Sequence, residues 1–137
     1  GELGLYFSEA TGAGGNGKIY KIVDGKASLY YEVKLADVGG FWGGDFAFDD
    51  KGNLYLSSGN RIPASIYKVE GGRVEEIFKD EKESIKGFVY QDGALYCANW
   101  QTKIYRLDIS TKERTVVYSN TKRTWLSDVD FRPELIG

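Results

Sequence analysis

Two Asp side chains stand at matching positions of two Trp-x-x-Asp sequences, one from Trp42 to Asp45 and one from Trp125 to Asp128. Carboxylate oxygens are the ligands that calcium and magnesium prefer, so this recurrence indicates a candidate cation site. The chain contains no histidine, which excludes Ser-His-acid and Cys-His catalysis and removes the commonest zinc ligand. Any hydrolytic chemistry would therefore need carboxylates or a metal ion held by oxygen atoms.

The elements that must position these side chains are clearest in residues 44–80. Four short apolar runs occur there, separated by turn sequences such as DDKGN at 49–53 and EGG at 70–72. Short apolar runs that alternate with Gly, Asn and Asp turns are typical of consecutive antiparallel strands. This stretch therefore predicts a four-stranded antiparallel meander.

The same unit recurs on both sides of this stretch. A Leu-Tyr pair begins at residues 5, 54 and 95, and an Ile-Tyr pair begins at residues 19, 66 and 104. Repeats of about 40–50 residues with four strands each are those of propeller blades. We therefore expect an all-β chain forming a β-propeller of four-stranded antiparallel blades, with three blades and twelve strands per chain. The single unit 1–137 would contain blade parts 4–32, 44–79 and 86–119, and a lone inner strand at 127–132.

Composition limits the classes of partner. The net charge is −2 and no basic cluster exceeds the pair Lys122 and Arg123, so we expect no nucleic-acid partner. No apolar run approaches the roughly 20 residues of a membrane span, so we expect no membrane segment. The single cysteine, Cys97, occupies the strand position of Phe7 and Leu56 in the other repeats. It is therefore expected to be a small core residue.

In a propeller, the crossings between blades and the loops after each second strand lie around the mouth of the central channel. This layout predicts a ligand-binding surface formed by Trp42, Asn60, Arg61, Asn99, Trp100 and Trp125. It places the candidate metal ligands Asp45, Asp128 and Glu9 at the same mouth. Simpler interpretations stay open. The tryptophans can pack between blades, and the two aspartates can accept hydrogen bonds from backbone amides at the start of an inner strand.

Three blades do not close a propeller, because closed rings have at least about four. An open arc would leave apolar blade faces and unpaired strand edges in water. We therefore expect a second copy of the chain to complete a six-bladed ring by two-fold symmetry. Asp45 and Asp128 of both copies would then surround one axis, and calcium or magnesium is the cation that would best compensate their repulsion.

The motifs FAFDDKGNLYLSS and ALYCANW…KIYRLD resemble those of the NHL-repeat propellers and of the related gluconolactonase and strictosidine-synthase-like propellers. The resemblance covers nearly the whole chain but only three of the six blades usual in these families. Its motifs are turns and core positions, so they specify architecture better than chemistry. The resemblance also gives a small preference for an extracytoplasmic location.

Three functions are compatible with the sequence. The first is a binding scaffold without catalysis, presenting the channel mouth to a protein, peptide, glycan or small molecule. The second is a metal-dependent lactonase or esterase of the gluconolactonase type, as the resemblance implies. Glu9, Asn99, Asp45 and Asp128 are the nearest counterparts of that family's ligands, although Val129 stands where its Asp-Gly pair would place glycine. The third is a structural part of a larger propeller without its own site.

Overall fold

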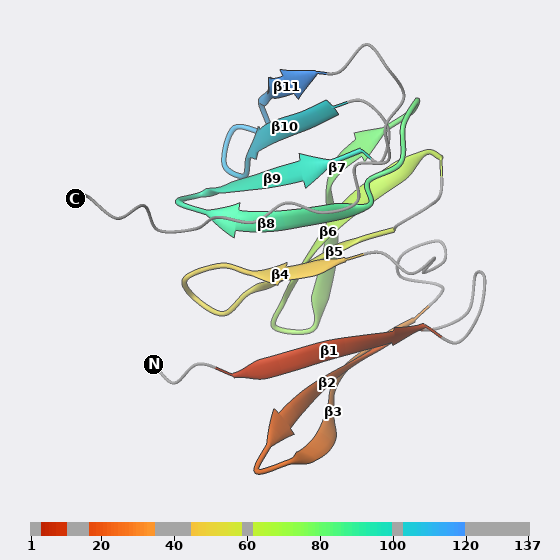
Figure 1. Ribbon diagram of the computed structural model, residues 1–137, viewed down its shortest axis with the longest axis vertical. Coiled ribbons are helices and arrows are strands. Elements are labelled where there is room, and N and C mark those ends of the chain that lie inside the picture. The colour runs from red at the N-terminus through yellow and green to blue at the C-terminus, as the bar shows by residue number, and fades with distance from the viewer. Residues whose placement is uncertain (1–3, 11–16, 35–44, 59–61, 100–102, 120–137) are drawn as a thin grey trace.

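A computed structural model of the chain describes residues 4–10, 17–34, 45–58, 62–99 and 103–119. Within these ranges every regular element is a β-strand and none is a helix. Eleven strands form three separate antiparallel sheets that are stacked face to face (Figure 1). None of the three sheets closes on itself. The expectation of an all-β chain is therefore confirmed for the described residues.

Each sheet is a meander in which neighbouring strands follow one another along the chain. The first sheet contains β1 (Leu5–Ala10), β2 (Gly17–Val23) and β3 (Lys26–Val33). The second sheet contains β4 (Phe46–Phe48), β5 (Leu54–Ser57), β6 (Ala64–Glu70) and β7 (Arg73–Asp80). The third sheet contains β8 (Gly87–Gln91), β9 (Ala94–Ala98), β10 (Lys103–Asp108) and β11 (Arg114–Ser119).

The first sheet has one described strand fewer than the others, and β1 lies at its edge. In the second and third sheets the corresponding edge is occupied by β4 and β8, which lie next to each other across the two sheets (Figure 1). The twelfth strand expected at 127–132 lies outside the described residues.

Two-residue turns connect several strand pairs and fix their register. Val23 pairs with Lys26 around Asp24 and Gly25, whose φ angles are 51° and 74°. Gln91 and Ala94 flank Asp92 and Gly93 in the same way, with φ angles of 46° and 82°. Two successive residues with positive φ form the turn whose twist matches that of antiparallel strands, and Asp-Gly tolerates it well. The turns predicted from these dipeptides are thus formed.

All three sheets carry a β-bulge at the same position. The register between the last two strands shifts within the repeated Ile-Tyr pair, at Ile19/Tyr20, Ile66/Tyr67 and Ile104/Tyr105. The extra residue lies on the last strand of each sheet and is Tyr30, Ile77 or Val117. A bulge of this kind increases the local twist and adds one side chain that has no partner across the pair.

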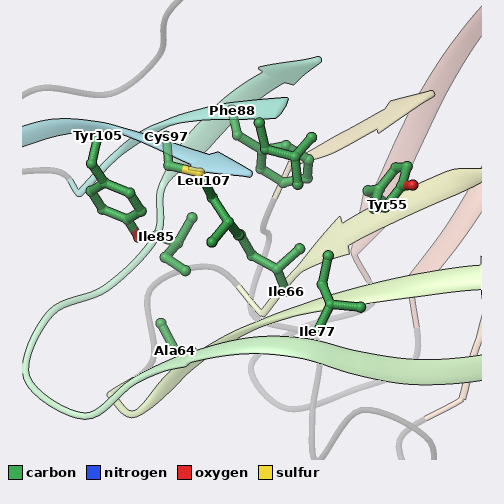
Figure 2. Packing of buried hydrophobic residues seen from close by; sticks show 10 residues of the cluster. Tyr55, Ala64, Ile66, Ile77, Ile85, Phe88, Cys97, Tyr105 and Leu107 are labelled. Carbon is green, nitrogen blue, oxygen red and sulfur yellow. The ribbon is translucent and has the colours of Figure 1, made fainter. Parts of the chain in front are cut away.

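The core lies between the sheets. Between the second and third sheets, buried residues form a continuous cluster (Figure 2): Tyr55, Ala64, Ile66, Ile77, Ile85, Phe88, Leu95, Cys97, Tyr105 and Leu107. A second cluster between the first and second sheets contains Ile19, Val33, Leu54, Leu56 and Val69. Cys97 is fully buried, as expected, and burial raises the pKa of its thiol.

The Tyr105 hydroxyl is buried and has no hydrogen-bond partner among the described residues. Burial raises the pKa of Tyr105, and the guanidinium of Arg114 lies 5.0 Å from its ring centroid. Arg114 also donates a hydrogen bond to Asp80 at 3.3 Å, which links the third sheet to the second. The ring of Tyr105 is thus held by packing and by the Arg114 guanidinium. Its hydroxyl makes no hydrogen bond within the described residues.

We therefore expect Tyr105→Phe to stabilise the chain by about 1 kcal/mol, because it removes an unsatisfied buried hydroxyl. Tyr55→Phe is the matched control. The Tyr55 hydroxyl donates to the Asp49 carboxylate at 3.1 Å, so its loss should destabilise the chain by about 1 kcal/mol. Urea unfolding midpoints measure both changes. Equal destabilisation by the two substitutions would contradict the expectation.

Candidate functional site

Three of the residues predicted to form the site are described by the structure: Glu9, Asp45 and Asn99. The other predicted ligand-binding residues, Trp42, Asn60, Arg61, Trp100 and Trp125, lie outside the described residues, as does the candidate metal ligand Asp128.

Asp45 immediately precedes β4 and connects two sheets. One carboxylate oxygen accepts a hydrogen bond from the amide of Phe46 at 2.8 Å, and the other accepts one from the amide of Phe88, in the third sheet, at 3.2 Å. Its own amide donates to the Ser57 hydroxyl at 3.0 Å, and its carbonyl accepts from the Ser57 amide at 2.9 Å. Asp45 is thus the backbone-bonded carboxylate that the sequence left open as the simpler interpretation.

Asn99 follows β9 and is buried. Its side-chain oxygen accepts a hydrogen bond from the Lys103 amide at 2.9 Å, and its side-chain nitrogen donates to the Glu83 carboxylate. The Lys103 ammonium lies 3.7 Å from the same carboxylate. We call these three residues the Glu83–Asn99–Lys103 cluster. Asn99 therefore holds the Glu83 carboxylate and the Lys103 backbone. The side chains of Glu83 and Lys103 are partly exposed, so solvent or a ligand can still reach them.

Glu9 lies near the end of β1, opposite Lys18 of β2. A hydrogen bond from the Tyr20 hydroxyl to the Glu9 carboxylate raises the pKa of Tyr20. Among the described residues, no three Asp, Glu or Cys side chains come together in a way that could hold a metal ion. The lactonase hypothesis also uses Asp128, which lies outside the described residues, so it stays a prediction.

A groove of about 510 Å³ lies at the opposite end of the second and third sheets, among their turns. The groove was not predicted from the sequence, because most of its lining residues were assigned to turns. The lining includes Asp49, Asp50, Tyr90, Asp92 and Asp108. These side chains are largely engaged locally. Asp49 accepts hydrogen bonds from the amides of Lys51 and Asn53 at 2.9 and 2.8 Å.

Two other acidic groups of the groove, Asp50 and Asp108, also accept hydrogen bonds. Asp50 accepts a hydrogen bond from the Tyr90 hydroxyl at 3.3 Å. Hydrogen bonds from the backbone amide of Thr111 and from the Ser110 hydroxyl lower the pKa of Asp108 to about 2. The groove is therefore explained by turn formation, and we assign no function to it.

The described residues thus define an all-β protein of three stacked antiparallel sheets with a polar cluster at one end. No helix long and apolar enough to cross a membrane occurs in the described part of the chain. No family model matches the chain, and neither does any curated protein.

Proposed function

We propose that the chain is the three-blade part of a β-propeller and serves as a ligand- or protein-binding scaffold without catalysis. Three features support this architecture. The sheets are four-stranded meanders, or three-stranded in the first, they stack face to face, and they carry the same bulge at the same repeat position. Stacked sheets of this kind with a repeat of about 40–50 residues are those of propeller blades.

The Glu83–Asn99–Lys103 cluster is the observation that supports a binding role. Asn99 is buried and holds both the Glu83 carboxylate and the backbone of Lys103, while the charged ends of Glu83 and Lys103 stay accessible. Polar groups that are already fixed before binding lose little conformational entropy when a ligand arrives. This arrangement favours a ligand that is recognised by hydrogen bonds and charge, without rearrangement of the binding surface.

Aromatic residues belong to the same proposed face. Trp100 follows Asn99 directly in the sequence, and the propeller layout assigns Trp42 and Trp125 to this end as well. Aromatic rings beside fixed polar groups are the usual composition of sites for peptides, glycans and other small ligands. We therefore propose an uncharged or zwitterionic ligand of this kind, bound at the end of the sheets that carries Asn99.

The three tryptophans of the chain provide the test, because all of them are assigned to the proposed face. Peptide and oligosaccharide arrays would supply candidate ligands, and binding would be titrated by tryptophan fluorescence. Lys103→Gln is expected to weaken binding about tenfold, the effect of losing one charge-assisted hydrogen bond to the ligand.

Lys112→Gln is the matched control, because Lys112 also pairs with a glutamate, Glu75, at 3.9 Å, but at the turn end of the sheets. It should leave the affinity unchanged. The proposal fails if no array member binds, or if the bound ligand is insensitive to Lys103→Gln and leaves tryptophan fluorescence unchanged.

A further inference from the structure

The first sheet turns one apolar face towards solvent. Leu5 is opposite Ile22, and Phe7 is opposite Tyr20, with the Phe7 and Tyr20 rings stacked at 5.0 Å. Leu29 continues this face on β3, opposite Tyr20. We call these five residues the first-sheet face. Leu5 is 65% exposed, whereas its repeat counterpart Leu54 is 3% exposed and Leu95 is buried.

The third sheet exposes the face that points away from the second sheet. Ile104 pairs with Tyr118 on the neighbouring strand, and the bulge residue Val117 lies between Tyr118 and Val116. We call Ile104, Val117 and Tyr118 the third-sheet face. Val117 is 52% exposed, whereas its counterpart in the second sheet, Ile77, is 6% exposed. Monomers rarely leave contiguous apolar surface of this kind uncovered.

The two exposed faces are the two halves of a contact that already occurs within the chain. Counterparts of the first-sheet face, such as Cys97 and Tyr105, pack against the preceding sheet. Counterparts of the third-sheet face, such as Ile66 and Ile77, pack against the following sheet. In particular, the rings of Phe78 and Tyr105 lie 5.9 Å apart between the second and third sheets. Their counterparts on the two exposed faces are Tyr118 and Tyr20.

We infer that the first-sheet face of one copy of this chain docks on the third-sheet face of a second copy, with Tyr118 against the partner's Tyr20. The contact continues a sheet-to-sheet interface that the chain already builds between its own sheets. Because the two faces lie on opposite sides of the stack, the contact is head to tail, so it must either close into a ring or extend without limit.

Two copies would supply six sheets, a number within the range of about four to eight that closed rings of this type contain. Closure by two copies rests on the propeller arrangement proposed above, whereas the docking of the two faces does not. The open edge of β1 would then face the strand that the sequence predicts at 127–132 of the partner. That segment lies outside the described residues.

Light scattering coupled to size-exclusion chromatography tests the inference on the full chain. We expect twice the mass of one chain at micromolar concentration. Phe7→Glu on the first-sheet face and Tyr118→Glu on the third-sheet face should each raise the dimer dissociation constant at least about 100-fold, since each change acts at both contacts of a two-copy ring. Ile62→Glu is the matched control, because Ile62 is exposed and lies on neither face.

The buried Cys97 thiol reports folding in every sample, because it lies between the second and third sheets. A variant that is monomeric but still protects Cys97 from a thiol reagent supports the inference. A variant that exposes Cys97 is replaced by the milder Leu5→Ser or Val117→Ser. An equimolar mixture of Phe7→Glu and Tyr118→Glu should regain part of the dimer through its one unaltered pair of faces.

Two results would overturn the docking of the two faces, and a third would overturn only the closure of the ring. The first is a wild-type monomer with a protected Cys97, which would also leave the faces free for sheets of another chain. The second is a dimer that neither glutamate substitution weakens. A mass that grows steadily with concentration would retain the docking but contradict closure, and with it the propeller arrangement. Ligand titration by tryptophan fluorescence is independent of all three, so failure of binding is distinguished from failure of docking.

Discussion

Ile66→Ala is expected to lower the free energy of unfolding by about 2–5 kcal/mol. Ile66 is 0% exposed and belongs to the cluster between the second and third sheets (Figure 2). Removing its side chain leaves a cavity between two sheets whose backbones are fixed by their own hydrogen bonds, so the gap cannot close without distorting both. Urea denaturation followed by circular dichroism measures the change.

Ile62→Ala is the control for this prediction. It deletes the same atoms from a side chain that is 59% exposed, and exposed substitutions of this type usually change stability by less than about 0.5 kcal/mol. A loss below about 1 kcal/mol for Ile66→Ala would show that the second and third sheets do not pack together as described.

Asp45→Ala is expected to cost about 2–3 kcal/mol, because it leaves two partly buried backbone amides without their charged acceptor. The amide of Phe88 should also exchange its hydrogen with solvent faster, since its bond to Asp45 joins the third sheet to the second. Asp45→Asn retains one side-chain oxygen and should cost about half as much. A fully stable Asp45→Ala variant would contradict the role of Asp45 as a link between sheets.

The response of the melting temperature to calcium distinguishes the structural role of Asp45 from the metal-site hypothesis. If the Asp45 carboxylate is committed to the two amides, millimolar calcium should leave the melting temperature of the wild-type chain unchanged. A calcium-dependent rise in melting temperature that Asp45→Asn abolishes would instead favour a metal site with Asp45 and Asp128, and would revive the lactonase hypothesis.

Local chemistry made much of the fold predictable from sequence. Asp24-Gly25 and Asp92-Gly93 tolerate the positive φ angles of tight hairpins, so these dipeptides locate turns without tertiary information. The recurring Leu-Tyr and Ile-Tyr pairs then located two neighbouring strands in every sheet, which are β1 and β2, β5 and β6, and β9 and β10. The finer expectation of a closed propeller stays a prediction, because it depends on contacts between sheets that no local pattern specifies.

The candidate site was less predictable for a related reason. One partner of the Asp45 carboxylate is the amide of Phe88, and one partner of the Asn99 side chain is Glu83. Both partners come from another part of the chain, and no sequence motif predicts either contact. Asn99 was predicted as a ligand-binding residue from its place after a strand. It is buried and holds Glu83 and the Lys103 backbone, and its contact with a ligand stays a prediction. Residue type and position alone do not distinguish these two roles.

The shared bulge is independent of the side chain that it carries. A bulge is the insertion of one residue into a strand, and here it lies opposite the same Ile-Tyr pair in all three sheets. The extra residue is Tyr30, Ile77 or Val117, so the position accepts an aromatic ring as well as two aliphatic side chains of different size. The register of the strands is thus the same in the three sheets, although the side chain at the bulge differs in each.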